Sequence, residues 1–162
     1  GPPLGIGAGT RYPVTRHRWN GCLDAWREAG GDPAGLRVAV CQANATGLGE
    51  AFADELLRGD DPPDAITAMS DELALGALRA AARTGRAVPG AVAITGWDDT
   101  DAAAPAGLTT VWQSLRDQGE RCARIVLGLP PPAGSQDPPG WQVIERASTR
   151  PAGRNRPAGR GV

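Results

Sequence analysis

The chain has 162 residues, of which 41% are hydrophobic, and a formal net charge of −1. That length is sufficient for one domain with a buried core, while the near-neutral charge gives no electrostatic footprint for nucleic acid. No apolar run approaches the roughly 20 residues that a membrane-spanning helix requires, so no membrane partner is expected.

The first predicted elements are a short strand at residues 4–9 and a helix at residues 15–30. The glycine spacing of the strand region lacks the third glycine and the later acidic residue of a dinucleotide-binding loop, so we expect no nucleotide cofactor. Thr15 is the predicted N-cap of the helix, which a glycine pair ends. Its buried side is predicted from the helical spacing of Trp19, Cys22, Leu23 and Trp26.

Residues 36–41 contain a continuous apolar run, which is typical of a strand buried on both faces of a parallel sheet. The loop that follows contains Asn44 and leads into a predicted helix at residues 48–57. The buried stripe of this helix is predicted to contain Phe52, Leu56 and Leu57.

The stretch from Asp64 to Thr110 contains the clearest pattern in the chain. Strands predicted at residues 65–68 and 91–95 flank a helix that begins at Ser70 and Asp71. Both residues are good N-caps, and we interpret Asp71 as a cap because a carboxylate stabilises a helix N-terminus. The order strand, helix, strand predicts a parallel crossover unit.

Downstream, residues 108–111 are predicted to be an extended crossover strand, residues 114–127 a helix and residues 141–146 a last strand. The helix has an apolar side made of Leu115, Cys122, Ile125, Val126 and Leu127. The loop at residues 130–140 is expected to be mobile. Residues 151–162 have almost nothing to bury and are expected to form a disordered tail.

Together these elements predict an α/β fold with an open parallel sheet flanked by helices. In such sheets ligands bind outside the carboxyl ends of the strands. We therefore expect Arg18, Ser70 and Asp98 to line a common crevice. Their polar groups suit ligand hydroxyls, and Trp97 offers a flat apolar face for a ring.

Several motifs then stand in a fixed order along residues 70–111. They are Ser70-Asp71, Ala74-Leu75-Gly76, Val88-Pro89, Gly96-Trp97-Asp98-Asp99 and Leu108-Thr109-Thr110-Val111. The set closely resembles the effector-binding domain of the LacI/GalR family of bacterial transcription regulators. The resemblance implies a Rossmann-like lobe of a type I periplasmic-binding-protein fold over residues 1–150, with a crossover segment at residues 108–128.

The resemblance also assigns ligand-binding roles. Arg18 matches an arginine that commonly reaches the effector in relatives, and Asp98 matches an aspartate that accepts hydrogen bonds from ligand hydroxyls. Ser70 and Asn44 stand roughly where relatives hold ligand-facing side chains. Trp97 is either a stacking surface for the ligand ring or a core residue.

The resemblance covers only the second half of the family's chain. It implies a sugar or nucleoside-like effector, a missing first lobe, and operator DNA as a partner only through a helix-turn-helix that is absent here. The helix at residues 114–127 then lacks its packing partner, and we expect it to associate through its apolar side or to be disordered. Regulators of this family are typically homodimers, with residues 73–79 and the helix after Asn44 as candidate interface.

Two hypotheses for function remain at this stage. The first is an effector-sensing domain that controls operator binding allosterically. The alternative is a solute-binding protein of a sugar ABC transporter, which shares the lobe fold. Fold analogy alone does not separate them, but the motif set favours the regulator.

Enzymatic chemistry is not expected. The three aspartates at residues 98–101 lack the spacing of an EF-hand loop and are too close in sequence for a glycosidase pair, so no metal is expected either. No nucleophile elbow with a histidine partner is present. The three cysteines, Cys22, Cys41 and Cys122, lie in apolar surroundings and predict buried, reduced thiols, which favours a cytoplasmic location.

Overall fold

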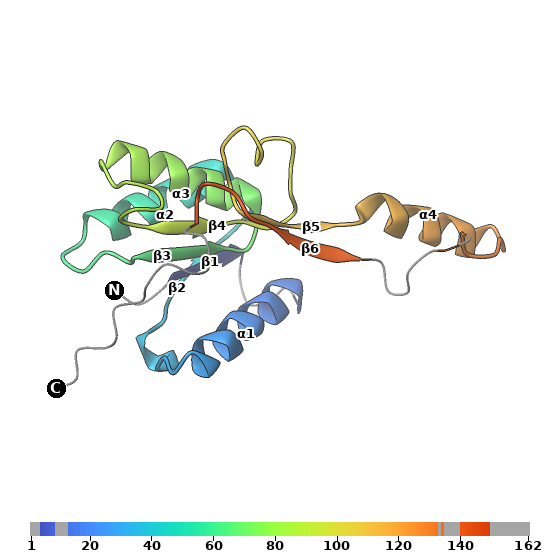
Figure 1. Cartoon of the computed structure of the whole chain (residues 1–162), viewed down its shortest axis with the longest axis horizontal. Coiled ribbons are helices and arrows are strands. Elements are labelled where there is room, and N and C mark those ends of the chain that lie inside the picture. The colour runs from blue at the N-terminus through green and yellow to red at the C-terminus, as the bar shows by residue number, and fades with distance from the viewer. Residues whose placement is uncertain (1–3, 9–12, 133, 135–139, 150–162) are drawn as a thin grey trace.

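The computed structural model describes residues 4–8, 13–132, 134 and 140–149. Its main sheet has four parallel strands in the order β2-β1-β3-β4. The strands are β1 (Leu4–Ala8), β2 (Arg37–Cys41), β3 (Ala65–Ala68) and β4 (Ala93–Thr95). Helix α1 (Pro13–Glu28) lies on one face of the sheet, and α2 (Thr46–Arg58) and α3 (Asp71–Arg83) lie on the other (Figure 1). The predicted α/β class with an open parallel sheet is confirmed.

The core lies between the sheet and the pair α2 and α3. Ile66 and Ile94 project from neighbouring strands and are 1% and 0% exposed, and Leu73 from α3 is 0% exposed. Burying a side chain of this size contributes about 2 kcal/mol relative to leaving it in water. This face of the sheet therefore supplies most of the packing that holds the strands in register.

Helices α2 and α3 approach each other at backbone distance. A Cβ atom built on Gly76 would lie 2.2 Å from the carbonyl oxygen of Thr46, and one on Gly49 would lie 2.3 Å from the carbonyl oxygen of Leu73. Only glycine leaves room for such a contact. The predicted helix stripe is confirmed in part, since Leu57 is buried while Phe52 and Leu56 pack partly buried against the core.

Strand β2 corrects the prediction of a strand buried on both faces. Ala39 and Cys41 are 9% and 1% exposed, whereas Val38 and Val40 alternate with them and are each 51% exposed. The reason is position, because β2 is an edge strand and α1 covers the second face of the sheet only in part. Helix α1 itself begins at Pro13 rather than at a Thr15 cap, consistent with the fixed φ of proline suiting a first helical turn.

An antiparallel ribbon leaves the sheet beside β4. It consists of β5 (Thr110–Gln113) and β6 (Trp141–Ile144), and it joins the sheet through a parallel bridge between Thr95 and Thr109. The ribbon carries α4 (Leu115–Val126) far from the sheet, as Figure 1 shows. No residue of α4 is buried.

Because α4 has no packing partner in the described chain, its cysteine does not behave as predicted. Cys122 is exposed, whereas Cys41 is buried and Cys22 is intermediate. The expectations for the tail at residues 151–162 and for part of the loop at residues 130–140 lie outside the described residues. None of the described helices is both long and apolar enough to cross a membrane.

Candidate functional site

The carboxyl ends of the strands bring Arg18 and Asp98 together. Arg18 lies early in α1, and its Nη2 donates to Oδ1 of Asp98 across 3.3 Å. Its Nη1 donates to the carbonyl oxygen of Met69, directly after β3, across 2.6 Å. The side chains of Arg18 and Asp98 are 15% and 32% exposed, so the ion pair is neither fully buried nor freely solvated. The structure thus joins three elements that are far apart in sequence through one guanidinium group.

The same guanidinium lies over the indole of Trp97, with its central carbon 4.4 Å from the ring centroid. This is a cation–π contact, and it occupies one face of the Trp97 ring. The Nε1 atom of Trp97 is buried without a hydrogen-bond partner. Trp97 therefore contacts the site through Arg18, and its covered face is not free to stack on a ligand.

Asp98 is held in an uncommon backbone conformation by the crossover ribbon. Its φ is 111°, in a region that residues with a side chain rarely adopt. The backbone N–H of Asp98 donates to the carbonyl oxygen of Val111 across 3.0 Å. Nε2 of Gln113 donates to Oδ1 of Asp98 across 3.2 Å. The ribbon therefore fixes the position of the carboxylate from both its backbone and its side chain.

Gln113 was missed by reasoning from the sequence. The signal that could have found it is its place two residues after the Leu108–Val111 motif, on a strand that leaves the ligand edge of the sheet. A glutamine amide has donors and an acceptor, and so it is able to contact both the carboxylate and a ligand hydroxyl.

Burial dominates the electrostatics of the pair. It raises the pKa of Asp98 above its ordinary value, and the nearby positive charge of Arg18 opposes this rise only in part. Burial likewise lowers the pKa of Arg18, against the opposing charge of Asp98. Both shifts mean that the charged groups lack the solvation that water or a polar ligand would provide.

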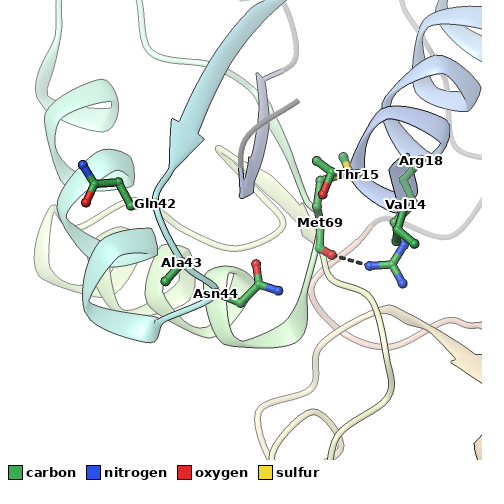
Figure 2. Close-up of a pocket in the computed structure, with 7 residues that line it drawn as sticks. All are labelled: Val14, Thr15, Arg18, Gln42, Ala43, Asn44 and Met69. Carbon is green, nitrogen blue, oxygen red and sulfur yellow. Dashed lines mark hydrogen bonds between the residues drawn. The ribbon is translucent and has the colours of Figure 1, made fainter. Parts of the chain in front are cut away.

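A pocket of about 370 Å³ lies beside this ion pair. Its lining comes from the start of α1, the loop after β2 and the end of β3 (Figure 2). The lining residues are Val14, Thr15, Arg18, Gln42, Ala43, Asn44 and Met69. Asn44 lines the pocket together with Arg18, whereas Figure 2 shows the Gln42 amide directed away from Arg18.

Ser70 is fully buried, whereas Arg18 and Asp98 are partly exposed. It is 0% exposed, and its hydroxyl accepts a hydrogen bond from the backbone N–H of Leu73, which makes Ser70 the N-cap of α3. The interpretation of Asp71 as the cap is wrong, because Ser70 occupies the N-cap position. Asp71 occupies the first helical position, and its buried carboxylate accepts from Thr110 Oγ1 across 2.6 Å and from the backbone N–H of Thr100 across 2.7 Å.

Comparison with known proteins identifies the family to which this fold belongs. Residues 5–149 match the family model described as a periplasmic binding protein-like domain. The chain belongs to this family.

Relatives of this periplasmic-binding-protein-like domain include transcription regulators. An HTH-type transcriptional regulator from Mycolicibacterium smegmatis is 34% identical over 123 residues, which are 76% of this chain and 33% of that protein. A putative LacI-family regulator of known structure from Sanguibacter keddieii is 29% identical, with a TM-score of 0.70, and the match covers 91% of this chain and 57% of that one. The resemblance to LacI-family regulators is thus confirmed, and the chain spans about a third to a little over half of these relatives.

A third protein shows the shared fold alone. The LacI-family regulator from Lactobacillus casei, solved with bound sucrose, is 22% identical with a TM-score of 0.75, and the match covers 91% of this chain and 57% of that one. The relatives are regulators rather than enzymes.

The second aspartate of the domain's aromatic-Asp-Asp motif has an anchoring role. Oδ1 of Asp99 accepts from Nη2 of Arg146 across 2.8 Å, and the same guanidinium donates through Nη1 to the carbonyl oxygen of Leu108. Ser148 donates to the carbonyl oxygen of Ile94 and accepts from the backbone N–H of Thr109. These bonds tie the segment after β6 to the edge of β4 and so stabilise the loop that presents Asp98.

The described residues contain no group of three or more histidine, cysteine, aspartate or glutamate side chains arranged to hold a metal ion. The groups present at the edge of the parallel sheet are one carboxylate, one guanidinium and two side-chain amides, which suit hydrogen-bond recognition.

Proposed function

We propose that this chain is the effector-sensing part of a bacterial transcription regulator, and that it binds a sugar or nucleoside-like molecule at the Arg18–Asp98 edge. The observation that carries the proposal is the incompletely solvated ion pair beside a pocket at the strand ends. Charge-assisted hydrogen bonds from these groups to ligand hydroxyls replace the missing solvation. Asn44 extends the polar lining on the opposite wall.

The alternative is a solute-binding protein of a sugar ABC transporter. The fold is compatible with both functions, so the choice rests on the relatives. Both the Mycolicibacterium and the Sanguibacter relatives are described as regulators, which favours the first function.

Partners follow from the surfaces that the chain leaves open. Helix α4 exposes apolar side chains that suit contact with the first lobe of a complete effector-binding domain. A helix-turn-helix outside this chain would contact operator DNA, and the location would be the cytoplasm. A homodimer would use the outer sides of α2 and α3, because their inner sides already pack against each other and the sheet.

An NMR titration of the 162-residue chain with sucrose, D-ribose and adenosine tests the site at millimolar ligand. We expect shifts at the amides of Arg18, Asn44 and Asp98, and a loss of affinity of about tenfold to a hundredfold in Arg18→Ala and Asp98→Ala, as for a hydrogen bond to a charged group. Asp101→Ala is the control, since Asp101 is exposed on the same loop. Retained affinity in both site variants would remove the assignment.

The function of the whole protein has a separate test. The coding sequence upstream of residue 1 would encode a helix-turn-helix in a regulator and a signal peptide in a transporter component.

A further inference from the structure

Among the described residues, Trp141 is the most exposed large aromatic side chain. It begins β6 and is 71% exposed. The register of the ribbon places it directly opposite Gln113. Side chains of directly opposite residues in an antiparallel pair project from the same face, with Cβ atoms about 5 Å apart. Trp141 is therefore the immediate neighbour of the residue that bonds to Asp98.

The two faces of the ribbon have different surroundings. Gln113 turns its amide to Oδ1 of Asp98, the same oxygen that accepts from Arg18. The opposite face carries Thr110, whose hydroxyl donates to the buried carboxylate of Asp71, and Trp112, which is two residues farther along the strand. The face that carries Trp141 is thus the one that meets the ion pair of the candidate site.

The chemistry of a sugar fits this juxtaposition. A sugar ring has hydroxyl groups at its edge and a flat face of C–H groups, and it is recognised by charged hydrogen-bonding groups beside an aromatic plane. Arg18 and Asp98 supply the first part. The covered face of Trp97 cannot supply the aromatic plane, because the guanidinium of Arg18 lies against it.

We propose that Trp141 is the stacking surface of the effector site and selects ligands with a sugar ring. This inference rests on the function proposed above. It assigns the aromatic part of the site to the crossover ribbon, so that the ligand contacts the main sheet and the ribbon at once. An effector bound in this way would bias the orientation of the ribbon and of α4 at its end.

The test combines calorimetric titration with tryptophan fluorescence, using sucrose and D-ribose as probes. Trp141→Ala should lower the affinity by about tenfold, which corresponds to the loss of one aromatic contact, whereas Trp141→Phe should keep most of it. The fluorescence change on binding should become smaller in Trp141→Phe, where Trp97 beside Arg18 still reports, while calorimetry still detects binding. Trp112→Phe is the matched control, because this second ribbon tryptophan is 38% exposed and projects from the opposite face.

The outcomes separate the inference from the function beneath it. Sugar binding that is lost in Arg18→Ala but unchanged in Trp141→Ala overturns the role of Trp141 and leaves the sensing function in place. Absence of binding in the unaltered chain overturns both. Circular dichroism of Trp141→Ala should match the unaltered chain, since the side chain is largely exposed.

Discussion

The surroundings of Asp98 in the folded chain disfavour the charged form of its carboxylate. Burial raises the pKa of Asp98, so the folded state holds the proton more tightly than the unfolded state does. The contribution of this group to stability is therefore present below the unfolded pKa and is lost as the pH rises through the folded pKa. A ligand that donates to the carboxylate would reverse this loss.

Asp98→Asn should separate stability from binding. The variant removes the ionisable group and keeps a residue type that tolerates a positive φ. We expect its free energy of unfolding, relative to the unaltered chain, to increase as the pH is raised from the acid range to neutrality, while sugar affinity falls. Urea denaturation across that pH range measures the difference. A variant that becomes less stable at neutral pH would mean that pairing with Arg18 outweighs the cost of burial.

The residue scale also shows where prediction from sequence ends. The meeting of Arg18 and Asp98 was predictable, because a helix start and a strand end place both residues at one edge of a parallel sheet. The roles of Ser70 and Asp71 were not, because both are N-capping types and a one-residue shift of the helix start exchanges them. The residue type of Gln113 does not predict its bond to Asp98, since that bond depends on the direction in which the ribbon leaves the sheet.

At the scale of elements, the contact between α2 and α3 depends on two glycines. Gly76→Ala should lower the free energy of unfolding by about 2–3 kcal/mol, because the new Cβ would collide with backbone atoms of α2 and overpacking has costs of this size. Chemical denaturation measures the change. Gly21→Ala is the control, since Gly21 lies inside α1 and a new Cβ there would meet no described atom within 4 Å beyond its own stretch of helix backbone. There the better helix propensity of alanine should stabilise by up to about 1 kcal/mol. Equal effects at both sites would contradict the close packing.

The elements themselves were largely predictable, and the exceptions have a common cause. Strand β3 and helix α3 follow directly from apolar spacing between clear stop signals. Strand β2 has the same apolar composition but is half open, because composition does not reveal which strand lies at the sheet edge. Cys122 was expected to be buried for the same reason, since an apolar stripe does not reveal whether a partner covers it.

At the scale of the whole molecule, hydrogen bonds connect the candidate site to the ribbon. The backbone of Asp98 bonds to Val111 and its side chain bonds to Gln113, both on β5. Arg146 extends this linkage from the segment after β6 to Asp99. A ligand that binds one orientation of the ribbon better than another would shift the population of both, and α4 would move with it. These bonds connect the candidate site to β5, the strand that leads into α4.

The exposed side of α4 should make the 162-residue chain self-associate. Ile125 and Val126 are 76% and 86% exposed on adjacent positions, and a contiguous apolar surface of this kind is seldom left in water. Sedimentation velocity should show concentration-dependent association that Ile125→Glu weakens by at least about tenfold, as expected for removing one large apolar contact and burying a charge in its place. Val38→Glu, at an exposed apolar position on the edge strand β2, should leave the association unchanged. A chain that remains monomeric at every concentration, with the α4 amides protected from hydrogen exchange, would show instead that this helix is stable without a partner.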